Sequence, residues 1–403
     1  MILNRERTVD NYQDGTVSAQ FIRTCINARF GVTESQLAVL VSDWHETEWE
    51  FFLSESAAEK IQPLLYEELA GKQLLPQSIE GVLENEYQSS AQKNLFLLHE
   101  LGNVINCLSQ AGIEAVVLKG AALLENIYGN IAARPMLDLD LLIKKEQVPR
   151  AVQLLLEEGY HQDIEPQAGS ALLYENELLL LKSGIKPIQL EIHWHLFDSP
   201  YYQREVNLDW FWEQSSSVEF GNFRGRIFRP EALLLHLFGH LALHHSDQPS
   251  ILWLVDLAEV LTAYKDLIDW DLVIEQAVEH HLVRSLQWST DQMMAFFLYP
   301  LIPMSVARKI ESLSVDAGEA VAFSMAIQAD RSVAHYIWSD ISLMPGRRSK
   351  LHFLVVKLIP APSYLRSRYN LDSSYQIPFN YLRHWWIGFY STVLLLKDLI
   401  IKR

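Results

Sequence analysis

The sequence predicts an α+β fold: a small mixed sheet preceded by N-terminal helices and followed by a large C-terminal helical domain. Two observations predict it. Short β-branched runs and alternating apolar segments fall between residues 113 and 228, whereas apolar residues recur every three or four positions before and after them. We therefore predict domains at 1–112, 113–228 and 229–403, with the helices of the middle domain on one side of its sheet.

The N-terminal region is predicted to be helical after a weakly patterned start over residues 1–31. Helical spacing runs through residues 34–71, and residues 78–110 read as one long helix with a continuous apolar side. Gly112 ends that helix directly before the first predicted strand.

A strand, a tight turn and a helix open the middle domain. Residues 114–118 are short and apolar, as expected for a buried strand. Lys119-Gly120 interrupts them, and the glycine allows a sharp bend and a close approach to a ligand. Residues 121–128 have helical spacing and end at Gly129.

Two aspartates follow on the next predicted strand, residues 137–143, just after Arg134. Alternate residues of a strand share a face, so Asp138 and Asp140 project together. Neighbouring carboxylates repel each other and need a cation or a shared proton. Oxygen ligands favour Mg²⁺ or Mn²⁺. Two roles are possible for Arg134: it forms an ion pair with either aspartate, or it contacts phosphate.

A second polar strand face is predicted in residues 188–196, after a helix over 147–159 and a segment over 171–181 that fits a strand, a hairpin or a helix. Glu191, His193 and His195 alternate with apolar residues and share one face. The two histidines either contact substrate or are partly exposed side chains beside a polar cleft.

The order Lys119-Gly120, Arg134, Asp138-Leu-Asp140 resembles the nucleotidyltransferase superfamily typified by DNA polymerase β, and more closely a bacterial branch described as uncharacterised nucleotidyltransferases. Lys-Gly stands where the general superfamily has Gly-Ser. The resemblance implies that Asp138, Asp140 and Glu191 bind Mg²⁺ (or Mn²⁺), and that Lys119, Gly120 and Arg134 bind the nucleotide. It further implies transfer of a nucleoside monophosphate from an NTP to a small-molecule or peptide acceptor that the sequence does not identify.

The C-terminal domain is predicted to be almost entirely helical from Pro230 onward, and two of its features concern the site. His236, His240 and His244 lie on one stripe of the first helix; they fit an interface near the site, with His240 a substrate contact, better than a zinc site. Asp256 lies within the apolar sequence WLVDL and therefore needs a partner. Nucleotidyltransferases of similar architecture suggest that Asp256 is a general base or a ligand of the substrate hydroxyl. Otherwise it caps a helix or forms a salt bridge.

Composition narrows the alternatives. The formal net charge of −17 argues against an extended nucleic-acid surface. Two cysteines, the absence of a signal sequence and the absence of a predicted transmembrane segment favour a reduced, cytoplasmic protein. Residues 385–396 are predicted to form a buried helix, or alternatively a membrane-interface anchor. A degenerate nucleotide-binding scaffold, and a toxin-like enzyme that modifies RNA or protein, remain as alternative functions.

Overall fold

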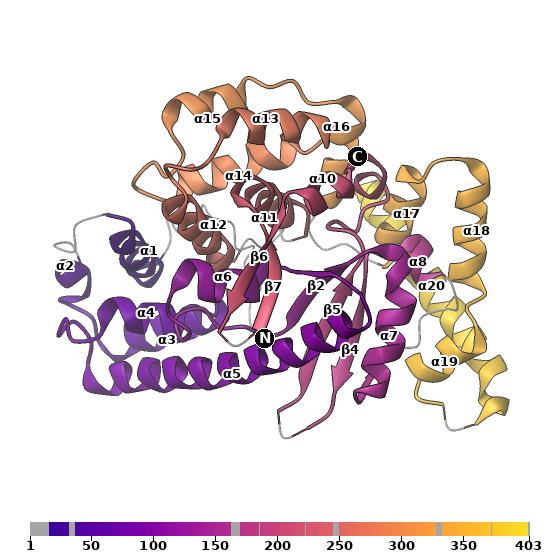
Figure 1. The fold of residues 1–403 in the computed structure, drawn as a ribbon, viewed down its shortest axis with the longest axis horizontal. Helices are drawn as coiled ribbons and strands as arrows, with labels where there is room; N and C mark the ends of the chain where they lie inside the picture. The colour runs from indigo at the N-terminus through magenta and orange to yellow at the C-terminus, as the bar shows by residue number, and fades with distance from the viewer. Residues whose placement is uncertain are drawn as a thin grey trace.

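The computed structural model describes residues 16–31, 37–162, 170–184, 186–221, 223–244, 250–327, 333–371 and 373–401, with the side chains of residues 125, 333 and 391–401 outside that description. Over these residues the fold is α+β, as predicted, with helices surrounding one mixed sheet (Figure 1). The N-terminal helices are α1 (Val17–Arg29), α2 (Leu37–Val41), α3 (Glu46–Ala58), α4 (Gln62–Leu69) and α5 (Gln77–Gln110).

The sheet has seven strands in the order β3-β4-β5-β2-β1-β7-β6. The pairs β2–β5 and β1–β7 are parallel and the others are antiparallel. In chain order the strands are β1 (Ala115–Val117), β2 (Leu139–Ile143), β3 (Tyr160–Gln162), β4 (Glu177–Lys182), β5 (Ile188–His193), β6 (Ser215–Phe220) and β7 (Phe223–Phe228).

Register places the polar residues of three strands next to one another. Asp140 on β2 lies directly beside Glu191 on β5. On the other side of β5, Glu177 at the start of β4 lies beside His193. Because side chains alternate along a strand, these four residues emerge on one face of the sheet.

Short elements connect the strands. The α-helix α6 (Lys119–Leu123) continues as a π-helix (Leu124–Tyr128), and Gly129 ends it in the left-handed region at φ 64°. A 3-10 turn (Lys145–Gln147) precedes α7 (Val148–Glu157). The uncertain segment 171–181 divides into the helix α8 (Ala171–Tyr174) and strand β4. Two further short helices, α9 (Tyr202–Glu205) and α10 (Leu208–Glu213), precede β6.

Helices cover both faces of the sheet, whereas we had predicted them on one. Leu101 of α5 and Leu155 of α7 share a hydrophobic core with Leu141 of β2. Leu142, which points the other way, belongs to a second core with Leu234 of α11 (Pro230–His244). The sequence-based prediction missed the second face because it did not consider α11, which follows the last strand of the sheet.

The remaining C-terminal chain is helical. Asp269 caps α13, since its side chain accepts hydrogen bonds from the backbone of Asp271 and Leu272. The elements are α12 (Ile251–Ala263), α13 (Trp270–Glu279), α14 (Val283–Phe296), α15 (Met304–Glu311), α16 (Ala317–Ala326), α17 (Val333–Leu343), α18 (Arg347–Leu358), α19 (Pro362–Arg368), a 3-10 turn (Ser374–Gln376) and α20 (Ile377–Ile401).

The N-terminal helices pack against the C-terminal ones. Arg23 of α1 donates hydrogen bonds to the carbonyls of Ala295 and Phe296, each at 2.7 Å. Arg29 forms ion pairs with Glu259 of α12 and with Glu67 and Glu68 of α4. The two helical regions thus share one hydrophobic core. The division into three domains remains a prediction.

The last helix differs from its prediction. We expected residues 385–396 to be buried, but Trp386 is 68% exposed and Phe389 is 63% exposed. Across the described residues, none of the helices combines the length and the apolar character that crossing a bilayer requires.

Two glycines of α5 provide a test of how closely this helix lies on the sheet. A Cβ added to Gly102 would lie 2.9 Å from the ring of Phe223, whereas one added to Gly81 would meet no atom within 4 Å. We expect Gly102→Ala to lower the free energy of unfolding by about 1–3 kcal/mol through overpacking. The matched Gly81→Ala should raise it by roughly 0.4–1 kcal/mol. Urea denaturation measures both, and equal effects would contradict the close contact.

Candidate active site

The turn between β1 and α6 is a strained bend that places a lysine beside the sheet. Lys119 adopts φ 46°, a left-handed conformation that is uncommon for a residue with a Cβ. The next residue must be small, because a Cβ on Gly120 would collide with Nη1 of Arg134 and lie 3.1 Å from its Cζ. The backbone of Leu118 meanwhile donates a hydrogen bond to the carbonyl of Asp140 at 3.0 Å, which joins the bend to β2.

Asp140 is the most enclosed carboxylate of the site. Its Oδ1 lies 2.7 Å from Nζ of Lys119 and 3.0 Å from Nε2 of His193. Burial alone would raise the pKa of Asp140, but the Lys119 ammonium and the His193 ring hold that pKa well below its usual range. Asp140 is therefore ionised at neutral pH, as a metal ligand must be.

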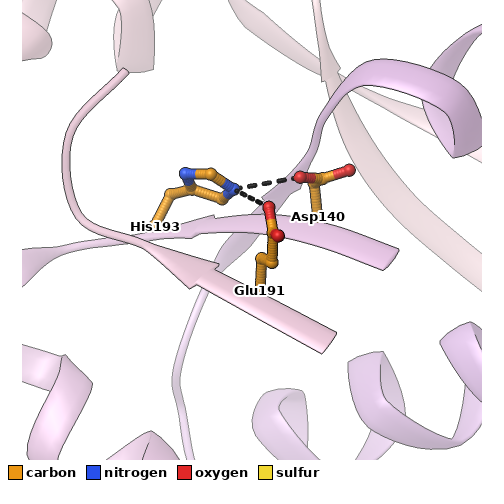
Figure 2. A group of neighbouring side chains, drawn as sticks. All are labelled: Asp140, Glu191 and His193. Carbon is orange, nitrogen blue, oxygen red and sulfur yellow. Dashed lines mark hydrogen bonds and ion pairs between the residues drawn. The ribbon is translucent and has the colours of Figure 1, made fainter. Parts of the chain in front are cut away.

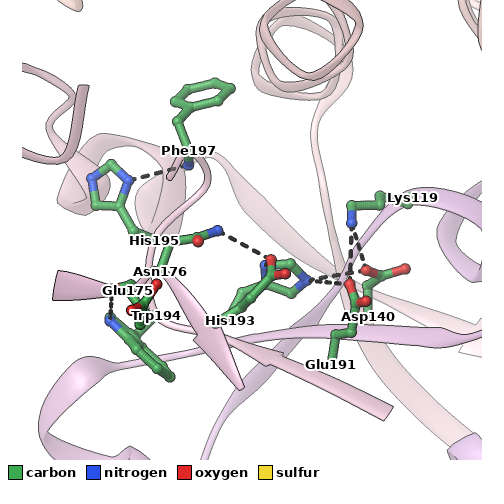
Figure 3. A network of polar contacts seen from close by, with 10 residues as sticks. Lys119, Asp140, Glu175, Asn176, Glu191, His193, Trp194, His195 and Phe197 are labelled. Carbon is green, nitrogen blue, oxygen red and sulfur yellow. Dashed lines mark hydrogen bonds and ion pairs between the residues drawn. The ribbon is translucent and has the colours of Figure 1, made fainter. Parts of the chain in front are cut away.

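Glu191 comes close to Asp140, as the β2–β5 register requires. Its Oε2 lies 3.5 Å from Nζ of Lys119 and 3.4 Å from Nε2 of His193. The side chain is partly exposed, in contrast to the buried Asp140. Two carboxylates from adjacent parallel strands thus converge on the same cation, which in this structure is the lysine ammonium (Figure 3).

His193 is buried at the centre of the cluster, contrary to the partly exposed alternative. Its Nδ1 lies 3.0 Å from Oε2 of Glu177 on β4, and Asn176 donates a hydrogen bond to the same oxygen at 3.1 Å. Burial and the neighbouring ammonium oppose a positive charge on the ring. Hydrogen bonds to the surrounding carboxylates nevertheless raise the pKa of His193 to about 10.

The residues that could hold a metal ion are Asp140, Glu191 and His193, whose ligand atoms all lie within 4.8 Å of one another (Figure 2). This group, found among the described residues, contains two of the three predicted ligands and adds His193. Asp138 lies one residue before β2 and is half-buried. Burial, followed by the charges of Asp140 and Glu191, raises the pKa of Asp138 to about 6.

Arg134 and Asp256 bind each other. Nε and Nη2 of Arg134 contact the two carboxylate oxygens of Asp256, each at 2.7 Å, and both side chains are buried. The hydroxyl of Tyr128 donates to Oδ1 of Asp256 at 2.7 Å. The structure therefore provides the partner that Asp256 needs within its apolar helix. The predicted roles of Arg134 in phosphate binding and of Asp256 as a base remain predictions.

The other predicted histidines are not part of the group formed by Asp140, Glu191 and His193. His195 is buried just past β5, where burial lowers its pKa to about 4 and its Nδ1 accepts a hydrogen bond from the backbone of Phe197. On α11, burial, Lys119 and His193 lower the pKa of His236 to about 3. His240 stands between His236 and His244 and makes an edge contact with Trp253. Among the described residues, this stripe forms no metal-ligand group.

Glu177 is a site residue that the sequence-based prediction missed. Burial would raise its pKa, but the hydrogen bond to His193 lowers it to about 2. A cavity of about 450 Å³ opens beside it, lined by residues 175–179, Asp198 and His244. This volume is in the range of ligand pockets. Only the pairing of β4 with β5 brings Glu177 to the site, and the ambiguous pattern of residues 171–181 concealed that strand.

Comparison with known proteins agrees with the geometry. The model of a family described as "Uncharacterised nucleotidyltransferase" matches residues 45–297, more than half of the chain. The match covers the sheet, the carboxylate cluster and the helices that carry the histidine stripe and Asp256. No curated protein matches the chain.

The Arg134–Asp256 pair generates a stability prediction. Asp256→Ala leaves a buried guanidinium unpaired, so we expect the free energy of unfolding to fall by about 3–5 kcal/mol. The exposed pair between Lys309 and Asp271, at 2.6 Å, supplies the control, and Asp271→Ala should leave the urea midpoint unchanged. The double variant Arg134→Met with Asp256→Leu should recover most of the loss. Wild-type stability in Asp256→Ala would contradict a structural role for the pair.

Proposed function

Because this chain belongs to the uncharacterised nucleotidyltransferase family, we propose that it is a Mg²⁺-dependent (or Mn²⁺-dependent) nucleotidyltransferase. It would move a nucleoside monophosphate from an NTP to a hydroxyl or phosphate of an acceptor and release pyrophosphate. The observation that supports this most directly is the convergence of Asp140, Glu191 and His193 beside the bend that opens α6.

The donor set fits a divalent cation. It offers two carboxylates and one imidazole whose ligand atoms are close enough to share one ion. Binding through His193 requires its ring to release the proton that the surrounding carboxylates favour. We propose Asp138 as a further carboxylate for the same centre, since it precedes Asp140 by two residues on one strand face. A bound ion would neutralise these charges and stabilise the charge that develops on the transferred phosphorus.

Lys119, Gly120 and Arg134 are proposed to receive the triphosphate. Lys119 opens α6, and its ammonium is already held at the cluster by Asp140. Gly120 leaves room for the Arg134 guanidinium to lie against the bend. Arg134 is proposed to reach the triphosphate through its position at the bend. Asp256 fixes Nε and Nη2 of its guanidinium, while Nη1 lies against Gly120.

The acceptor is proposed to bind in the cavity beside Glu177, which polar side chains and His244 of α11 line. His195 and His240 are proposed to contact the acceptor near this cavity. Asp256 remains the proposed general base, and that role requires its contacts with Arg134 and Tyr128 to open.

One observation favours the alternative of a catalytically degenerate scaffold. The Lys119 ammonium touches both Asp140 and Glu191, so a covalently attached cation stands among the groups that would bind a metal ion. In an active enzyme the lysine and the ion compete for these carboxylates. In a degenerate protein the lysine alone satisfies them.

Nucleotide binding tests the proposed enzyme. We expect one or more NTPs to raise the melting temperature only when Mg²⁺ is present. Ligand at about 100 times its dissociation constant stabilises a protein by about 2.7 kcal/mol. The shift should disappear in Asp138→Ala with Asp140→Ala and persist in Glu219→Ala, an exposed acid on β6.

Pyrophosphate release against a panel of small-molecule and peptide acceptors then measures turnover. Metal-dependent release that the double aspartate variant lacks would support the proposal. An unchanged melting temperature with every NTP, with and without Mg²⁺, would contradict it and favour the scaffold.

Replacing Lys119 tests whether the lysine and a metal ion compete for the same carboxylates. In the enzyme, Lys119→Met removes a competing charge, so Mn²⁺ should bind at least about tenfold more tightly, equivalent to about 1.4 kcal/mol. Titration followed by electron paramagnetic resonance measures free Mn²⁺. Lys309→Met, which also removes a lysine from a carboxylate, serves as the matched control and should bind Mn²⁺ like the wild type. Weaker binding in Lys119→Met would show that the lysine does not compete with the ion.

A further inference from the structure

The last helix, α20, carries an apolar stripe that faces solvent. Phe379, Leu382, Trp386, Phe389 and Tyr390 recur at helical spacing, so they lie on one side of the helix. All five are exposed, from 57% for Tyr390 to 74% for Phe379. This is the reverse of the usual amphipathic helix, which turns its apolar side toward the protein core.

Specific hydrogen bonds on the opposite side fix this orientation. The Tyr381 hydroxyl donates to the carbonyl of Pro360 at 2.5 Å, and Nε1 of Trp385 donates to the carbonyl of Leu358 at 2.6 Å. Nε2 of His384 lies 2.9 Å from the carbonyl of Lys357. These contacts hold α20 against the end of α18 and the start of α19, so the helix cannot turn its stripe inward without losing them.

A second exposed apolar row lies on α18, which packs beside α20 at one end of the molecule (Figure 1). Leu351, Val355 and Leu358 follow one another at intervals of four and three residues and are all exposed. They are aliphatic, so they offer hydrocarbon to bury but no aromatic ring for a nucleic-acid base to stack on.

The charge of this segment is opposite to that of the rest of the chain. Residues 347–403 contain ten basic and two acidic residues, a net charge of +8, whereas the other residues carry −25. Five arginines of the segment are exposed and form no ion pair within the described residues: Arg347, Arg348, Arg366, Arg368 and Arg383. Exposed cations beside an apolar aromatic stripe are the features that bind anionic membrane surfaces.

We propose that α18–α20 form a peripheral docking surface for an anionic lipid bilayer. The stripe of α20 would enter the headgroup region, where tryptophan and tyrosine side chains are favoured, while the arginines contact lipid phosphates. A second copy of the chain fits this surface less well, because a symmetric contact would bring two segments of charge +8 together. This proposal is independent of the proposed catalytic function.

The surface lies near the cavity of the candidate active site. Phe353 of α18 packs edge-on against Tyr174 of α8, with ring centroids 5.1 Å apart, and Lys357 forms a 3.1 Å ion pair with Glu175. Glu175 also lines the cavity beside Glu177. The inner side of α18, opposite its exposed apolar row, therefore reaches the rim of this cavity.

Co-sedimentation of the full chain with lipid vesicles tests the proposal. We expect binding to vesicles of phosphatidylcholine with phosphatidylglycerol, much weaker binding to phosphatidylcholine alone, and loss of binding as salt is added. Trp386→Ser with Phe389→Ser should weaken partitioning at least about tenfold. Arg347→Glu with Arg348→Glu should weaken binding to the anionic vesicles by about tenfold or more.

Matched controls keep the test specific. Phe51→Ser removes an exposed aromatic residue from α3, and Arg308→Glu with Lys309→Glu reverses two adjacent charges on α15; both should bind vesicles like the wild type. Circular dichroism and melting temperature confirm that each variant is folded. Equal binding to neutral and anionic vesicles would overturn the proposal, as would no binding to either. Two outcomes would identify a different occupant: self-association that the Trp386 and Phe389 changes abolish, or salt-sensitive binding of single-stranded RNA without vesicle binding.

Discussion

The parallel pairing of β2 with β5 is the constraint on which the candidate site depends. Its register puts Asp140 beside Glu191, and these two like charges need a cation within reach. The Lys119 ammonium supplies one, 2.7 Å from the first carboxylate and 3.5 Å from the second. That charge is placed by the strained conformation of Lys119 and by the small Gly120, which leaves room for the Arg134 guanidinium.

The residues of the site could be predicted to the extent that local patterns specify them. Alternation along 137–143 and 188–196 correctly put Asp140 and Glu191 on polar strand faces, and the family resemblance paired the two strands. Glu177 and the central position of His193 could not be predicted, because they follow from the antiparallel register of β4 against β5. Register is a long-range property, and no local pattern in residues 171–181 specifies it.

The same limit explains two differences in the helical regions. An acid in an apolar helix signals a partner, but the sequence could not indicate that Asp256 pairs with Arg134, 122 residues away. Apolar periodicity correctly predicted that the chain after Pro230 is largely helical, yet it could not reveal which side of the last helix faces solvent. That side is decided by backbone carbonyls of the preceding helices, which accept hydrogen bonds from Tyr381 and Trp385.

The position of α11 determines how reactants reach the site. Every residue of this helix from Ala232 to Leu243 is buried, and Gly239 allows Phe197 to pack against its backbone. A helix enclosed in this way forms a fixed roof over the carboxylates rather than a movable lid. If the protein has the proposed activity, reactants would enter from the side, through the cavity that Glu177 and His244 line.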